Sequence, residues 1–166
     1  RGEFKESQKL IDEGIRKLKS VKPKVIKYSS DINSTFMLDG EKELCEAIFF
    51  ICFTSNKVVP SKYFNIFSPS SLLKGMAEAA SELRRSALDK IRDNEVIESE
   101  KYLEIMNGVV DVLESVDFPE GVTAGLRRTT DQLRSVVERT RGDITIALER
   151  KELEISINSL KEELKK

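Results

Sequence analysis

Apolar residues recur three and four positions apart along most of this chain, and this spacing constrains the fold more than any other feature. Residues at these intervals fall on one face of an α-helix, whereas a half-buried strand alternates apolar and polar residues. The pattern predicts amphipathic helices that each bury one face. The clearest stripe comprises Leu72, Leu73, Met76, Ala80, Leu83, Ala87 and Ile91.

Turn-forming residues are too few for a protein of many short strands. The 166 residues include only 4 Pro and 8 Gly, whereas sandwiches and barrels need frequent turns. A chain of this length suits one domain. We therefore expect residues 1–166 to form a single all-α domain, an antiparallel bundle of about six helices. The apolar patterns place these helices at about 4–21, 24–39, 41–54, 69–93, 96–117 and from Glu120 to the C-terminus.

Proline and glycine mark the expected helix boundaries. Pro23 suits the first turn of a second helix, and Pro69, preceded by the hydroxyl of Ser68, suits the first turn of another. Residues 55–70 are expected to form the one long loop. Gly40 leaves open whether the apolar patterns on its two sides form one helix or two.

The composition restricts the available chemistry. Histidine is absent, which removes the commonest general base and transition-metal ligand. Cys45 and Cys52 lie in an apolar run, which favours buried thiols in a reducing compartment over a disulfide or a zinc site. No signal peptide opens the sequence, and its longest apolar run, 47–53, is far shorter than the roughly 20 residues of a membrane span. We expect a soluble, cytoplasmic protein.

Basic residues are unevenly distributed, although the net charge is only −1. Residues 1–27 contain nine Lys and Arg against four acids, and a second basic group lies near residue 130. Either group could follow a phosphate backbone, and a solvated charged face explains each equally well. The second group consists of Arg127, Arg128, Arg134, Arg139 and Arg141.

Residues 41–54 are the most hydrophobic part of the sequence, and Glu46 interrupts the apolar residues 44–53 within it. A helix that is apolar on every side is buried, so an ionised carboxylate within it must be paired, protonated or bound to a cation. Glu43 lies three residues earlier, on the same face. Two such carboxylates repel each other unless a cation lies between them, and oxygen ligands favour a hard ion such as Mg²⁺.

Glu78 and Glu82 form a second acidic pair, four residues apart on one face of the helix that begins at Pro69. Gly75 shares this side, and so small a residue lets another surface approach. If this helix faces the helix of the first acidic pair, four carboxylates converge, as they do in helical bundles that bind metals. The alternative is that the acids are solvated and have Lys or Arg neighbours.

Two stretches resemble the translin and translin-associated factor X family. One runs Gly-Glu-Lys-Glu-Leu-Cys-Glu-Ala-Ile-Phe-Phe over residues 40–50, and the other runs Leu-Leu-Lys-Gly-Met-Ala-Glu-Ala-Ala-Ser-Glu-Leu-Arg-Arg over residues 72–85. Weaker similarity covers most of residues 30–150. The resemblance implies a translin-like helical fold and assembly into hollow octamers with RNA held inside.

The same resemblance implies roles for individual acids. In the factor X type, acidic residues bind Mg²⁺ and cleave RNA, whereas translin-type chains lack these acids and bind nucleic acid. Glu43 and Glu46 match the acids of the first catalytic helix. Glu82 matches a Glu, and Glu78 stands where the family usually has Asp, which is one methylene shorter. The chain therefore resembles the factor X type, and it lacks the His/Trp/Arg stretch with which translin-type chains contact nucleic acid.

We predict an Mg²⁺-dependent endoribonuclease, with Mn²⁺ as a substitute cofactor, that acts on single-stranded or partly double-stranded RNA inside a homo-oligomer. Glu43, Glu46 and Glu78 would hold the metal, and Glu82 would be a further catalytic acid. Arg85, which matches an Arg of both family types, would bind phosphate or steady the acids. The five arginines near residue 130 would contact RNA or single-stranded DNA.

Two alternatives stay open. A non-catalytic nucleic-acid-binding oligomer would bind oligonucleotides in a salt-sensitive manner without cleaving them. A helical assembly protein, whose acids pair with Arg85 or Lys42, would show no salt-dependent affinity for oligonucleotides.

Overall fold

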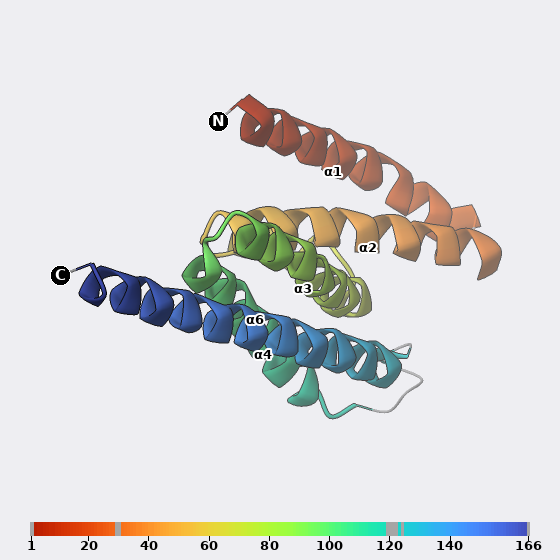
Figure 1. Ribbon diagram of the computed structural model, residues 1–166. Coiled ribbons are helices and arrows are strands. Elements are labelled where there is room, and N and C mark those ends of the chain that lie inside the picture. The colour runs from red at the N-terminus through yellow and green to blue at the C-terminus, as the bar shows by residue number, and fades with distance from the viewer. Residues whose placement is uncertain (1, 29–30, 119–122, 124, 166) are drawn as a thin grey trace.

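The structure, a computed structural model, describes residues 2–28, 31–118, 123 and 125–165. All regular secondary structure in these ranges is helical, which confirms the predicted fold class (Figure 1). The described helices are α1 (Gly2–Tyr28), α2 (Asp31–Thr54), the short 3₁₀ helix η1 (Ser61–Tyr63), α3 (Pro69–Arg92), α4 (Val96–Glu114) and α6 (Leu126–Glu163).

Helix α3 begins where the sequence predicts. The hydroxyl of Ser68 accepts a 3.3 Å hydrogen bond from the N–H of Ser71, and Pro69 holds the first helical position. Both features satisfy or remove backbone donors that a helix N-terminus leaves unpaired. After α3, Asn94 adopts a positive φ of 63°, which asparagine tolerates, and the chain enters α4 after only three residues.

The predicted break at Pro23 is wrong. Pro23 lies inside α1, which continues to Tyr28, and α2 begins at Asp31, so the described residues of the predicted helix 24–39 are divided between α1 and α2. A proline removes one hydrogen bond from a helix, and the turns on both sides of it can still keep the segment helical. Gly40 also lies inside a helix, α2. The predicted start at Glu120 falls outside the described residues, and α6 begins at Leu126.

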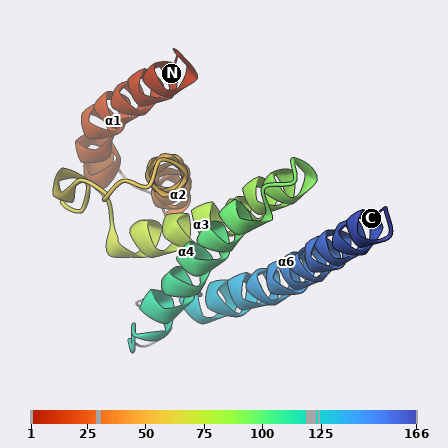
Figure 2. The same cartoon turned by 60° about the vertical axis from the view of Figure 1, so that its left-hand side comes forward.

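Helix α3 lies at the centre of the bundle (Figure 2). Helix α2 packs on one side of it and α4 and α6 pack on the other, while α1 covers α2. Two apolar clusters fill these contacts. One includes Ile11 and Ile48 between α1, α2 and α3, and the other includes Leu83, Met106 and Leu133 between α3, α4 and α6.

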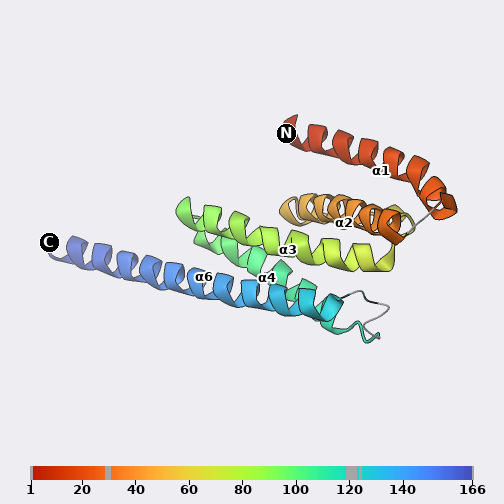
Figure 3. The ribbon, with the colours of Figure 1, turned by 90° about the vertical axis from the view of Figure 1, so that its right-hand side faces the viewer.

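Helices α2 and α3 run parallel, which differs from the antiparallel neighbours that were expected (Figure 3). Towards the beginning of both helices, the hydroxyl of Ser71 donates a 3.1 Å hydrogen bond to the carbonyl of Leu38. Further along both helices, Gly75 contacts Cys45. The segment 55–68 carries the chain back along α2 before α3 begins. The acidic pairs of the two helices therefore lie at similar heights.

The two cysteines are free and buried, as predicted. Burial is the main cause that raises the pKa of the Cys45 thiol to about 12, and it also raises the pKa of Cys52. Neither sulfur is therefore a thiolate at neutral pH. In the part of the chain that the structure describes, no helix is long and apolar enough to cross a bilayer.

Candidate metal centre

The candidate site depends on the close approach of α2 and α3 at Gly75. A Cβ added to Gly75 would lie 2.5 Å from the Cβ of Cys45. It would also lie 2.7 Å from the carbonyl oxygen of Lys42 and 2.9 Å from the backbone nitrogen of Glu46. Only glycine leaves enough room for this contact. Because Glu78 follows Gly75 by three residues, it lies on the face of α3 that is turned towards α2.

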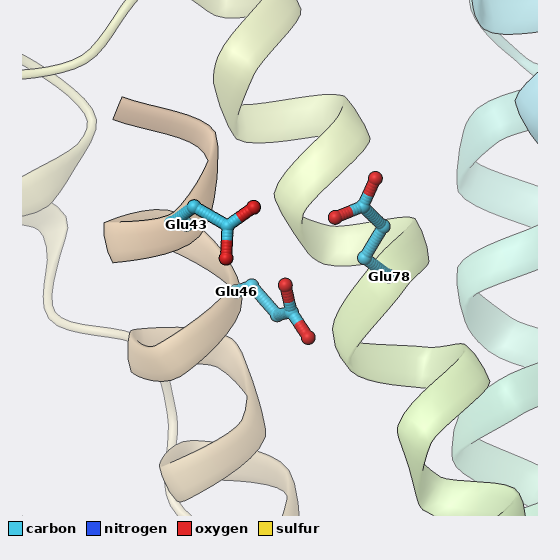
Figure 4. A group of neighbouring side chains, drawn as sticks. All are labelled: Glu43, Glu46 and Glu78. Atoms are coloured by element: carbon cyan, nitrogen blue, oxygen red, sulfur yellow. The ribbon is translucent and has the colours of Figure 1, made fainter. Parts of the chain in front are cut away.

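Three acids, which we call the acidic triad, meet between these helices. One carboxylate oxygen from each of Glu43, Glu46 and Glu78 lies within 4.8 Å of the other two. Figure 4 shows the carboxyl groups pointing towards one another from the facing helices. Glu43 is exposed, and the other two acids are half-buried. The structure thus brings together three of the four acids that the sequence singled out.

Glu46 is half-buried, whereas the sequence predicted that apolar residues would enclose it. This acid faces the edge of the α2–α3 contact, where water has access. Burial is nevertheless the main cause that raises its pKa, and the negative charges of Glu78 and Glu43 raise it further. A neighbouring negative charge raises the pKa because it disfavours the ionised form of the Glu46 carboxyl group. The Glu46 carboxyl group therefore favours a cation or a proton beside it.

Lys42 supplies a positive charge to the triad. Its Nζ donates a 3.0 Å hydrogen bond to Oε1 of Glu78 and lies 2.9 Å from Oε2. It also lies 3.3 Å from Oε1 of Glu43. The hydrogen bond to Glu78 is the main cause that raises the pKa of Lys42, so this side chain is an ammonium ion at neutral pH. This ion pair between Lys42 and Glu78 is a contact of the kind that was expected if the chain were a helical assembly protein.

The donor atoms of the triad fit a hard divalent cation. Three carboxylate oxygens suit Mg²⁺ or Mn²⁺ better than metals that prefer nitrogen or sulfur. Ligands on opposite sides of Mg²⁺, each at about 2.1 Å, lie roughly 4.2 Å apart. Oxygens within 4.8 Å of one another can therefore reach a common ion through small side-chain movements, with water as the remaining ligands.

Comparisons with known proteins show which proteins this chain is similar to. No protein-family model matches the sequence. An uncharacterized protein of Methanocaldococcus jannaschii is 29% identical over 145 residues, which cover 86% of this chain but only 61% of that protein. AfC3PO is an archaeal translin/TRAX-like protein whose structure is known in complex with duplex RNA. This chain matches that structure with a TM-score of 0.74 and 31% sequence identity, over 88% of this chain and 75% of that chain. This chain belongs to the translin family. A further crystal structure of AfC3PO matches with a TM-score of 0.72 and 29% identity, over 88% of this chain and 76% of that chain.

In this translin-family chain, Glu82 does not join the triad. Glu82 is exposed, and its carboxylate lies 4.0 Å from the guanidinium of Arg85, which is also exposed. One helical turn, a rise of about 5.4 Å, separates Glu82 from Glu78 along α3. The acids whose oxygens lie within 4.8 Å of one another are Glu43, Glu46 and Glu78, and this group does not include Glu82.

The five arginines of α6 also lie away from the triad of this translin-family chain, because α3 lies between α2 and α6 (Figure 2). Arg134 and Arg141 form ion pairs with acids of α4 and α6. All five side chains are exposed, these two as well as Arg127, Arg128 and Arg139.

Glu41 is a fully buried acid that the sequence did not reveal. Nζ of Lys22 lies 2.8 Å from one of its oxygens, and the backbone N–H of Ser68 donates a 2.8 Å hydrogen bond to the other. These contacts join α1, α2 and the start of α3. Glu41 gave no signal because Asp39 and Gly40 precede it in a polar stretch that looks solvated.

Arg84 was also not predicted. Its guanidinium lies 2.8 Å from the carboxylate of Asp143 and donates a 3.2 Å hydrogen bond to the hydroxyl of Thr140. These contacts attach α6 to α3. The sequence shows only that Arg84 follows Leu83, a residue of the apolar stripe on α3. It does not identify the partners of Arg84, because they come from a distant helix.

Proposed function

We propose that this chain is an Mg²⁺-dependent endoribonuclease of the translin family that cleaves single-stranded or partly double-stranded RNA. The acidic triad is the observation that carries this proposal. The similarity to AfC3PO, which has been solved with duplex RNA, supports RNA as the substrate class.

The residues around the triad would share the chemical work. Glu43, Glu46 and Glu78 would hold the divalent cation. Bound Mg²⁺ would lower the pKa of a coordinated water and neutralise charge on the scissile phosphate. Glu82, which stays outside the triad, would accept a proton. Arg85 has an exposed guanidinium on the same helix and would bind phosphate.

The exposed arginines of α6 would contact the RNA backbone at a distance from the triad. Because α3 separates α6 from the acids of α2, these arginines would bind a distant part of the same RNA or an RNA that is held by a neighbouring subunit. Single-stranded DNA presents the same backbone charge and would compete for them.

We further propose that the chain forms a homo-oligomer, an octamer as the resemblance implies. Two apolar segments could make subunit contacts, residues 44–53 and the end of α6. Ile48 and Phe49 of the first lie in the core of this chain. The stripe near the end of α6 is exposed and supports assembly, because apolar patches of this kind usually mark interaction sites. The stripe consists of Leu153, Ile157, Leu160 and Leu164, which are 61%, 42%, 59% and 87% exposed.

Incubation of the purified chain with a labelled RNA that has single-stranded and duplex portions tests the proposal. We expect cleavage with Mg²⁺ and none with a chelator. Glu46→Gln and Glu78→Gln should each lower the cleavage rate by more than about tenfold, because even outer-shell partners of a metal contribute that much. Glu104→Gln, which changes an exposed acid of α4, is the control. Unchanged cleavage by both triad variants would contradict the assignment.

The ion pair of Lys42 supports a second candidate, a non-catalytic nucleic-acid-binding oligomer. Lys42 already neutralises part of the charge of Glu78, so the acids have a structural partner without a metal. This candidate predicts salt-sensitive RNA binding and no cleavage in either Mg²⁺ or Mn²⁺.

A further inference from the structure

Lys42 contacts the same carboxylate oxygens that a metal ion would need. Its Nζ lies within 3.0 Å of both oxygens of Glu78 and 3.3 Å from one oxygen of Glu43. The lysine side chain is only 22% exposed. It is therefore held against the facing helices and does not extend freely into solvent.

An ammonium group and a divalent ion compete for these oxygens. Mg²⁺ approaches its ligands to about 2.1 Å, and a second positive charge beside the same carboxylate repels it. Because both oxygens of Glu78 already contact Lys42, an ion that binds Glu78 lies beside the ammonium and weakens these contacts by repulsion. Lys42 itself is built into α2 and cannot diffuse away.

We propose that Lys42 is a tethered competitor of the divalent ion, which holds Glu78 and Glu43 together in the metal-free chain and releases Glu78 when the ion binds. The inference rests on the proposed metal site. The four-carbon stem of lysine is flexible, so the ammonium can move to the exposed carboxylate of Glu43 or to solvent. Meanwhile the backbone contact at Gly75 keeps α2 and α3 in place. The acids are thus assembled before the metal arrives, and metal binding is weaker as a result.

Removal of the charge at residue 42 should therefore strengthen metal binding. Lys42→Met keeps the unbranched shape of the lysine stem and removes the ammonium, and we expect it to lower the Kd for Mn²⁺ by roughly fivefold, the scale of a partly exposed ion pair. Lys42→Arg keeps the charge and can contact a carboxylate with two nitrogens. It should leave the Kd unchanged or raise it.

Titration of the whole chain with Mn²⁺ alone, followed by electron paramagnetic resonance of the free ion, measures these constants. Lys101→Met is a matched control, because Lys101 forms a 2.7 Å ion pair with Glu98 on α4, away from the triad. Thermal melting shows whether each variant is folded. If Lys42→Met does not fold, Lys42→Gln provides the same comparison.

The possible results separate this inference from the proposed function. Tighter Mn²⁺ binding by Lys42→Met, with equal or weaker binding by Lys42→Arg, supports the competition. Binding by Lys42→Met alone, with none by the wild type, also supports it and refutes metal dependence of the native chain. Equal or weaker binding by Lys42→Met overturns the inference and leaves the metal site intact. If neither the wild type nor Lys42→Met binds at millimolar Mn²⁺, both are overturned.

Discussion

The backbone of Gly75 lies directly against the side chain of Cys45, and this contact sets the distance between α2 and α3. A Cβ at Gly75 would lie 2.5 Å from that of Cys45. We expect Gly75→Ala to force the helices apart and to lower the free energy of unfolding by about 1–3 kcal/mol. It should also weaken Mn²⁺ binding, because Glu78 moves with α3. Urea unfolding and Mn²⁺ titration measure the two effects.

Gly142→Ala is the control for this prediction. Gly142 lies inside α6, and an added Cβ there would meet no atom within 4 Å. Alanine favours a helix by up to about 1 kcal/mol over glycine, so this variant should be as stable as the wild type or slightly more so. Equal stability of the wild type and Gly75→Ala would contradict the close approach.

The buried pair of Lys22 and Glu41 should respond asymmetrically to mutation. Lys22→Met leaves the fully buried carboxylate of Glu41 without its cation, and we expect a loss of roughly 3 kcal/mol in unfolding free energy. Glu41→Gln should cost less, because Gln still accepts the hydrogen bond of Ser68 and the partly exposed ammonium of Lys22 can reach water. Urea unfolding of both variants tests the order, and the reverse order would contradict it.

Glu46→Gln should stabilise the metal-free chain at neutral pH. Burial and the charges of Glu78 and Glu43 raise the pKa of Glu46 in the folded state. A raised carboxyl pKa adds stability at low pH, and this contribution disappears as pH rises through the folded-state pKa. The variant should therefore melt at a higher temperature than the wild type at pH 7, and the difference should shrink towards pH 4. A wild type that melts higher at pH 7 would refute this.

The two cysteines should resist thiol reagents in the native protein. Burial raises the pKa of Cys45 to about 12, so almost no thiolate is present at pH 8, and both thiols are covered. We expect slow labelling by a disulfide reagent at pH 8 and rapid labelling of both thiols in guanidinium chloride. Rapid labelling of the folded chain would show that α2 is exposed.

Local signals predicted the helices well, and contacts between distant segments limited the rest. Ser68 and Pro69 marked the start of α3 correctly because a cap acts within one turn. Pro23 did not end α1, because one lost hydrogen bond is a local cost that the rest of a 27-residue helix can outweigh. The parallel course of α2 and α3 was not predicted, because the path of the long connection depends on tertiary packing.

The candidate site could likewise be predicted from the sequence only in part. The faces that carry Glu43, Glu46 and Glu78 follow from helical spacing, and Gly75 indicated where another helix could approach. The distance of Glu82 from the triad depends on where the helices cross, which spacing alone does not determine. Spacing also did not identify Glu41 as the buried acid, because its partners come from α1 and from the loop before α3.

Helix α6 is 38 residues long, or about 57 Å at 1.5 Å per residue. Every described residue beyond residue 151 is exposed, and this end projects past the other helices (Figure 3). Because an α-helix is stiff, the contacts along its first half, such as that between Arg84 and Asp143, determine the direction of its free end. A slight tilt of the first half of α6 therefore produces a much larger displacement at its C-terminal end.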